Sequence, residues 1–414
     1  MTIVALLLAN SPLTENYAHF FHTKIDLNIG SWELSHTIHH WINDGLMAIF
    51  FFIIGLEIKR EILVGELSSI KVALLPILSA IGGMLFPALI YFTINANTTG
   101  ANGWGIPMAT DIAFAISALV LLGKRVPPAL VTFLVALAIV DDLGAVLVIA
   151  LFYTEQIHLL PLALAGGSFL ILVAFNRFGI HMILPYFIVG LCMWFFMLES
   201  GVHATIAGVI AAMAIPSIPK EAPHDFSRRT KNLLDEYDNY PIGEDCLMHE
   251  KQKAILLTIK ESINAVGTPA GRLEQDLHLP VALIVIPLFA LANAGIAIDF
   301  SSMGTTIMTP VSLGIIIGLI LGKVLGIFGV AWLAIKLKIA TLPQGSTMNQ
   351  IFGVAFLGGI GFTMSIFVAD LAFINNPELI FQAKVGILVA SLIAGFFGYF
   401  WLRFIAKSTP MPMN

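Results

Sequence analysis

The stretch that decides the fold is FLVALAIVDDLGAVLVIALF, residues 133–152. Its length is what an α-helix needs to cross the roughly 30 Å hydrocarbon core of a bilayer. Two adjacent aspartates, Asp141 and Asp142, interrupt an otherwise apolar run. On insertion scales an ionised aspartate at mid-membrane costs roughly 2.5–3.5 kcal/mol. A membrane segment that carries two of them needs a reason for both.

Composition places the whole chain in the membrane class. Of its 414 residues, 58% are hydrophobic and 11% are charged, whereas soluble domains carry about 25% charged residues. The apolar runs are continuous rather than alternating with period two, which excludes a β-barrel. The sequence therefore predicts an all-α polytopic membrane protein with a single domain, 1–414. We identify eleven spans, at residues 40–58, 72–94, 104–122, 127–153, 158–175, 181–198, 202–218, 279–298, 311–335, 350–373 and 380–405.

The first ten residues, MTIVALLLAN, resemble part of a further span. About ten residues cannot cross a bilayer as a helix. The segment also lacks the basic region and the cleavage site of a signal peptide. We therefore expect a truncated first helix and a native product that starts upstream of Met1.

Basic residues predict the orientation. With alternate loops taken as cytoplasmic, only Lys24 and Lys384 lie outside, which is the positive-inside pattern, so the C-terminus is expected in the cytoplasm. Residues 219–273 form a long cytoplasmic loop insertion, in which 250–266 could form an amphipathic helix. A tolerated surface insertion accounts for this loop more simply than a regulatory module does. The residues that lie inside are Lys59, Arg60, Lys71, Lys124, Arg125, Arg177, Lys336, Lys338, Arg403 and Lys407. The two cysteines, Cys192 and Cys246, are interpreted as unpaired thiols.

Ionisable residues inside the spans are few. Asp44, Glu57 and Asp370 lie near span ends, where reaching the interface accounts for them. Four lie deep, and a structural ion pair between helices is their simplest explanation. Three acids and one base cannot all be mutually paired, however, so at least one acid is left to hold a proton or a cation. The deep residues are Asp111, Asp141, Asp142 and Lys323.

Helix geometry separates the two adjacent aspartates. Neighbouring residues on a helix point about 100° apart, so one of them can meet Lys323 while the other faces a cavity. Lys323 lies beside a stripe of glycines at every fourth position, where another helix backbone can approach closely. The stripe is Gly314, Gly318, Gly322 and Gly326.

Two spans carry signals of interruption. Asp111 lies in GIPMATDIAFAIS, residues 105–117, after Pro107 and beside Thr110. The stretch FLGGIGFTMSIF, residues 356–367, has three glycines at a comparable depth. Two interrupted helices at corresponding positions indicate an inverted-repeat transporter with its site at the membrane midplane.

Six motifs together resemble the NhaA family of bacterial sodium/proton antiporters. They lie in one order along nearly the whole chain: INDGLMAIFFFIIGLEIKRE (42–61), ATDIAFA (109–115), VDDLGAV (140–146), SGVHATIAGV (200–209), PLFALANAGI (287–296) and GIGFTMSIF (359–367). The resemblance implies about 12 transmembrane helices with inverted repeats, two of them discontinuous and crossing at mid-membrane. It implies no enzyme activity, no cofactor and no nucleic-acid partner.

The resemblance also implies an activity and its residues. It implies an electrogenic, pH-regulated antiporter of the inner membrane that exports Na⁺ or Li⁺ for more than one proton by alternating access. Na⁺ would bind at Asp141 and Asp142, with Asp111 and Thr110 on the unwound helix and Lys323 paired with Asp141. Residues 23–36 match the hairpin that joins two protomers. The pH-sensing candidates are Glu57, Arg60, Glu61, Glu274 and His278, to which we add His203.

One motif departs from the family, and two other functions stay open. The family typically has Lys-Arg-Leu-Glu-His where this chain has Gly-Arg-Leu-Glu-Gln at 271–275, so the pH profile is expected to differ. An intramembrane aspartyl protease would also use two membrane aspartates, but Lys323 would disturb the proton that such a pair shares. A sodium-coupled solute symporter is the other alternative.

Overall fold

The computed structural model describes all residues except 30–31, 155–156, 241–249, 298–302 and 406–414. The tip of the predicted hairpin, part of the predicted loop insertion, Cys246 and Lys407 lie outside the described residues. Cys192 is an exposed free thiol.

The eleven predicted spans are all largely helical. Within the described residues, seven helices are long and apolar enough to cross a membrane, and a bent helix pair brings the number to eight. Three others, α4 (Met47–Leu63), α9 (Ile183–Glu199) and α10 (Thr205–Ala214), are shorter. The predicted polytopic all-α class is confirmed. The seven long helices are Ile70–Asn95, Ala101–Val120, Pro128–Phe152, Leu159–Arg177, Pro269–Asn293, Pro310–Lys336 and Pro377–Phe404.

Several of these long helices change winding along their length. Three of the seven are uniform α-helices: α5 (Ile70–Asn95), α7 (Pro128–Phe152) and α8 (Leu159–Arg177). The other four combine segments of different winding: η3 and α6 (Ala101–Met108, Ile112–Val120); α13, η5 and α14 (Pro269–Pro280, Val281–Val285, Ile286–Asn293); α16, η6, η7 and α17 (Pro310–Ile317, Gly318–Gly322, Val324–Gly329, Val330–Lys336); and α20 with η8 (Pro377–Phe400, Trp401–Ile405). The bent pair is α18 and α19 (Met348–Leu357, Phe362–Ala372).

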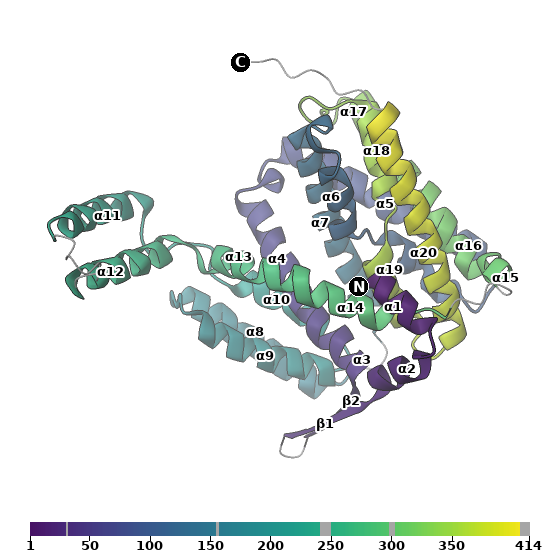
Figure 1. Ribbon diagram of the computed structural model, residues 1–414, viewed down its shortest axis with the longest axis horizontal. Coiled ribbons are helices and arrows are strands. Elements are labelled where there is room, and N and C mark those ends of the chain that lie inside the picture. The colour runs from purple at the N-terminus through teal and green to yellow at the C-terminus, as the bar shows by residue number, and fades with distance from the viewer. Residues whose placement is uncertain (30–31, 155–156, 241–249, 298–302, 406–414) are drawn as a thin grey trace.

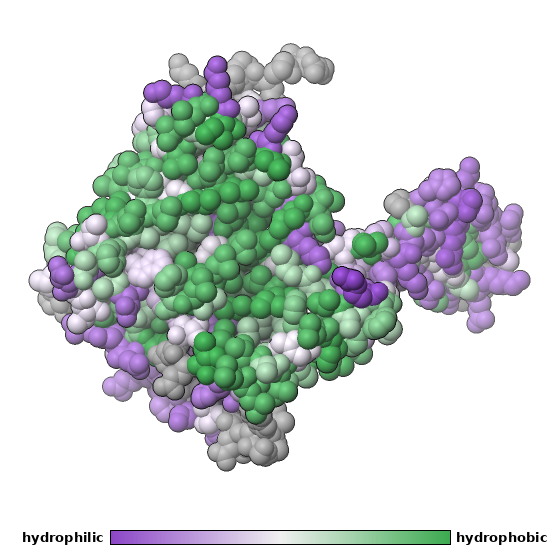
Figure 2. Space-filling view, turned by 180° about the vertical axis from the view of Figure 1, so that it is seen from behind, coloured by the Kyte–Doolittle hydropathy of each residue, from purple (hydrophilic) through white to green (hydrophobic). Residues whose placement is uncertain are grey.

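The segments outside the spans form two projections (Figure 1). Strands β1 (Lys24–Ile29) and β2 (Trp32–Thr37) pair antiparallel, from Lys24 with Thr37 to Ile29 with Trp32. The predicted amphipathic helix is present as α12 (Glu250–Val266), packed on α11 (Pro223–Asp238). Figure 2 shows that this helix pair is mostly hydrophilic, whereas the main body is hydrophobic. The remaining short elements are α1 (Thr2–Ala9), α2 (Thr14–His22), α3 (Ile38–His40), η1 (Trp41–Leu46), η2 (Glu66–Ser68), η4 (Gly123–Arg125) and α15 (Met303–Ile307).

One helix starts earlier than predicted. Helix α13 begins at Pro269, inside the stretch assigned to the loop insertion. The Thr268 side chain caps it by accepting a hydrogen bond from the Gly271 N–H at 3.1 Å, and a proline at the first helical position is pre-organised for the helix. The apolar run that marked the span thus follows a polar first turn of the same helix.

Close backbone contacts hold two groups of helices together: α5 with the span from α16 to α17, and α4 with α10. A Cβ on Gly326 would lie 2.2 Å from the Gly82 carbonyl oxygen of α5, which confirms the predicted close approach along the glycine stripe. A Cβ on Gly208 of α10 would lie 2.2 Å from the Ala48 carbonyl oxygen of α4. Neither pair of helices can accept a larger residue there without a backbone shift.

Candidate ion-binding site at two crossed helix breaks

The two predicted helix interruptions are present, and they meet. The first break comprises residues 109–111, between the 3₁₀-helix η3 and α6, and follows Pro107. The second comprises residues 358–361, between α18 and α19, whose axes bend by 47°. The Asp111 N–H donates to the Ile360 carbonyl at 2.6 Å. Backbone groups freed by one break thus find partners in the other, as non-helical chain at membrane depth requires.

Asp111 connects the two breaks through hydrogen bonds to its carboxylate. Its carboxylate accepts hydrogen bonds from the Phe114 N–H at 3.3 Å and the Thr363 N–H at 3.0 Å, and the Thr363 hydroxyl also donates to it. It therefore lies at the N-termini of α6 and α19, where the helix dipoles favour a negative charge. Thr363 lies in the second interrupted stretch, at residues 356–367, but was not among the predicted site residues.

Lys323 connects the first break to α7 through an ion pair and two hydrogen bonds. Its side chain and that of Asp141 are fully buried, with Nζ 2.7 Å from the Asp141 Oδ2. The same ammonium donates to the Thr110 hydroxyl at 2.9 Å and to the Met108 carbonyl. Three donors thus meet three acceptors, which is the full capacity of a lysine. Thr110 in turn donates to the Gly358 carbonyl at 2.8 Å, so Lys323 is also joined to the second break.

Asp142 is the exception in this polar cluster. It is fully buried, yet within the described part of the chain neither of its carboxylate oxygens has a hydrogen-bond partner, and Asp141 Oδ1 has none either. A buried carboxylate without a partner is costly. A proton or a bound cation removes that cost, and oxygen ligands suit a hard cation. The structure therefore presents three free carboxylate oxygens from two adjacent residues.

The pH-sensing candidates lie in two places. Arg60 of α4 pairs with Glu274 of α13 and with Glu61 at 3.0 Å. Glu57 is one turn earlier on α4, within electrostatic range of that group. His278 is exposed. The structure does not bring His203 to the group: its Nε2 lies 2.8 Å from the carbonyl oxygen of Tyr153, at the end of α7.

Two charges that we assigned to the interface have protein partners instead. Asp370 lies 3.2 Å from Lys384 of α20, and Asp44 lies 3.2 Å from the His40 ring. The expectation for these two residues was therefore incomplete. A charge near a span end can be stabilised by water or by a partner on another helix, and sequence position alone does not separate the two.

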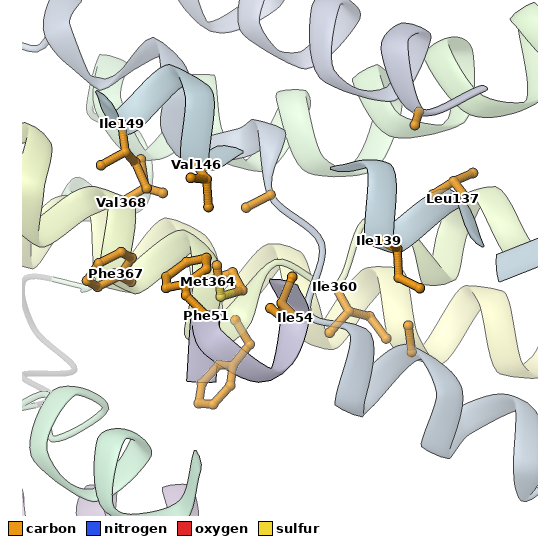
Figure 3. Close-up of a cluster of buried hydrophobic side chains, with 14 of the residues drawn as sticks. Phe51, Ile54, Leu137, Ile139, Val146, Ile149, Ile360, Met364, Phe367 and Val368 are labelled. Atoms are coloured by element: carbon orange, nitrogen blue, oxygen red, sulfur yellow. The ribbon is translucent and has the colours of Figure 1, made fainter. Parts of the chain in front are cut away.

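Apolar side chains of α4, α7 and α19 gather beyond Asp142, toward the hairpin ends of these helices; Figure 3 shows them close together. Phe51 of α4 and Phe367 of α19 have ring centroids 5.8 Å apart. Val146 and Ile149 follow Asp142 along α7 and are buried. With Met364 and Val368 of α19, these residues form what we call the apolar layer.

Crossed helix breaks around buried carboxylates and a buried lysine, in a multi-pass helical protein, define the architecture of a secondary ion transporter. Sequence comparison makes the assignment specific. The family described as Na+/H+ antiporter 1 matches residues 1–402. The Na(+)/H(+) antiporter NhaA of Sulfurimonas denitrificans is 70% identical over 408 residues, which are 99% of this chain and 92% of that protein. The Na(+)/H(+) antiporter NhaA 1 of Saccharophagus degradans is 50% identical over 402 residues, 97% and 87% of the two chains. The chain belongs to the NhaA family of Na⁺/H⁺ antiporters.

Proposed function

We propose that this protein exchanges Na⁺ or Li⁺ for protons at Asp141 and Asp142. The observation that carries the proposal is the buried, unpartnered carboxylate of Asp142 beside the Asp141–Lys323 ion pair. The names of its relatives support the same exchange. The protein is then a transporter of the bacterial inner membrane rather than an enzyme, and it needs no cofactor.

Competition for the same oxygens couples the two ions. At alkaline pH the aspartates ionise, and Na⁺ binds from the cytoplasm to Asp142 and to the free oxygen of Asp141. No cluster of three or more His, Cys, Asp or Glu side chains placed for a metal occurs in the described residues, and hydroxyl, carbonyl or water oxygens would complete the coordination. After the site turns outward, protons displace the ion. Since empty carboxylates are costly in a low dielectric, the moving helices cross only when the site is occupied.

More than one proton can exchange per sodium ion. Asp142 gives up one proton when Na⁺ binds, and Asp141 or Lys323 gives up another when Na⁺ disturbs their ion pair. Both protons return when Na⁺ leaves. Each cycle would then move net charge, and about 2.3 kcal/mol per charge per 100 mV becomes available from the membrane potential. The transporter is therefore electrogenic and can export sodium against its gradient.

Two further features of the proposal rest on surface elements. Arg60 forms ion pairs with Glu61 and Glu274 and so joins α4 to α13. Protonation of the two carboxylates would weaken these ion pairs, loosen the helix contact and regulate transport with pH. With the C-terminus in the cytoplasm, this group faces the cytoplasm and the β-hairpin faces outward. A projecting two-stranded sheet can pair edge to edge with a second copy, which supports a homodimer through residues 23–36.

The test is sodium-driven proton movement in everted vesicles. Addition of Na⁺ or Li⁺ should dequench a pH-sensitive dye, with no organic solute present, and Asp142→Asn should abolish the response. Asp276→Asn is the matched control because Asp276 is exposed on α13. Normal exchange by Asp142→Asn would refute the assignment. A response that requires an added solute would favour the symporter, and cleavage of a membrane substrate would favour the protease.

A further inference from the structure

A second buried polar cluster lies outside the apolar layer, toward the β-hairpin. The His39 Nε2 donates to the Asn293 Oδ1 at 2.8 Å, and the Asn293 amide donates to the Asn43 Oδ1 at 2.8 Å. The Asn43 amide reaches the Asp370 Oδ2 at 3.5 Å, and Asp370 pairs with Lys384 at 3.2 Å. We call these five residues the outer latch. Neither the ion site nor the pH-sensing group uses them.

The outer latch joins the two groups of helices. His39, Asn43 and Asn293 belong to α3, η1 and α14, which lie with α4, α10 and α13 (Figure 1). Asp370 and Lys384 belong to α19 and α20, which pack against η3, α16 and α18. The hydrogen bond from Asn43 to Asp370 crosses from one group to the other.

The contacts within each group differ in kind from those between the groups. Inside each group, backbone lies directly against backbone: Gly208 of α10 packs against α4, and Gly326 of η7 packs against α5. Between the groups, on the hairpin side, side chains meet: the rings of Phe289 and Phe51 lie 6.2 Å and 5.8 Å from that of Phe367. A hydrogen bond contributes about 0.5–1.5 kcal/mol net. Such contacts can break in every transport cycle, whereas backbone packing persists.

The outer latch lies between the apolar layer and the extracytoplasmic side of the protein. Asn43 and Asn293 are buried, at 8% and 1% exposed. The Asp370 and Lys384 side chains are 11% and 14% exposed. Asn43 precedes Phe51 at the hairpin end of its helix, and Asp370 follows Phe367 on α19. Since Val146 and Ile149 follow Asp142 along α7, the latch lies outside the apolar layer, and the apolar layer lies outside Asp142. An ion can leave Asp142 outward only when both layers part.

We propose that the outer latch is the extracytoplasmic gate of this transporter, closed in this structure and opened when the helix group of Asp370 moves away from that of Asn43. The inference rests on the proposed exchange function. Asp370 and Lys384 hold each other on the moving side, and the chain from Asn43 to His39 presents the matching amides on the other side.

The main experiment locks the gate covalently. In a Cys192→Ser, Cys246→Ser background, Asn43→Cys and Asp370→Cys are cross-linked with a short bis-methanethiosulfonate in everted vesicles. Exchange should be lost on cross-linking and return on reduction. The control pair is Asp370→Cys with Lys384→Cys, because both lie in one group; its exchange should be the same before and after the reagent. Undiminished exchange by the cross-linked Asn43–Asp370 pair would overturn the proposal.

A second measurement needs no transport. Met364→Cys in the apolar layer is labelled with a membrane-impermeant thiol reagent applied from the extracytoplasmic side. Adding Asp370→Asn should raise the labelling rate several-fold, because the ion pair with Lys384 and the bond to Asn43 weaken. An unchanged rate would overturn the gate. Because labelling does not require exchange, failure of the gate and failure of the proposed function are distinguishable.

Discussion

The ion pair between Lys323 and Asp141 offers the largest measurable perturbation. Both side chains are fully buried, 2.7 Å apart, and Lys323 also holds Thr110 and Met108. Lys323→Ala removes the positive charge and leaves Asp141 buried without it. Breaking a buried ion pair on one side costs about 3–5 kcal/mol. At about 1.4 kcal/mol per factor of ten, that is a loss of roughly 10²- to 4 × 10³-fold in the ratio of folded to unfolded protein.

The assay is thermal unfolding of the purified protein, followed by tryptophan fluorescence. Lys323→Ala should melt well below the wild type, whereas Lys323→Ala with Asp141→Asn should recover much of the loss because the orphaned charge is gone. Lys336→Ala is the control: that lysine is exposed and lies over the Trp332 ring at 4.6 Å. If Lys323→Ala melts like the wild type, or the double variant recovers nothing, the ion-pair reasoning is wrong.

Two further predictions follow from packing and from the helix crossing. Gly326→Ala should lower the free energy of unfolding by about 1–3 kcal/mol, because its Cβ would meet the Gly82 carbonyl oxygen. Gly329→Ala is the control and should be neutral, since nothing lies within 4 Å of a Cβ there. Equal denaturation midpoints for the two variants would contradict this. Thr363→Val removes a hydrogen bond to the Asp111 carboxylate and should cost about 1.5–3 kcal/mol, whereas Thr363→Ser should retain most of it; equal losses in the two variants would show that the hydroxyl is not responsible.

The centre of the molecule was predictable from residue types alone. Asp111, Lys323 and the aspartate pair stand out because charge is rare at that depth. Pro107 and the glycines at 358, 359 and 361 mark the two breaks directly. The glycine stripe around Lys323 predicts the close approach of another helix, which the structure identifies as α5. Each signal is local in the chain and has one dominant physical cause.

The periphery was less predictable, for two physical reasons. Partners far apart in sequence, such as Asn43 with Asn293, leave no periodic signal, and the pairing of Asp370 with Lys384 depends on how two helices pack. Helix α13 begins in a charged turn that hydropathy cannot distinguish from a loop, although the cap at Thr268 and Pro269 is a start signal.

The central claim is that sodium and protons compete for Asp141 and Asp142. The direct test is the Na⁺ affinity of the purified protein, measured by calorimetry at a series of pH values. Each proton that Na⁺ displaces should weaken the apparent Kd up to tenfold per unit of acidification and be released on binding. Asp142→Asn should lose this pH-dependent binding. A Kd that stays constant with pH, with no proton released, would contradict the account.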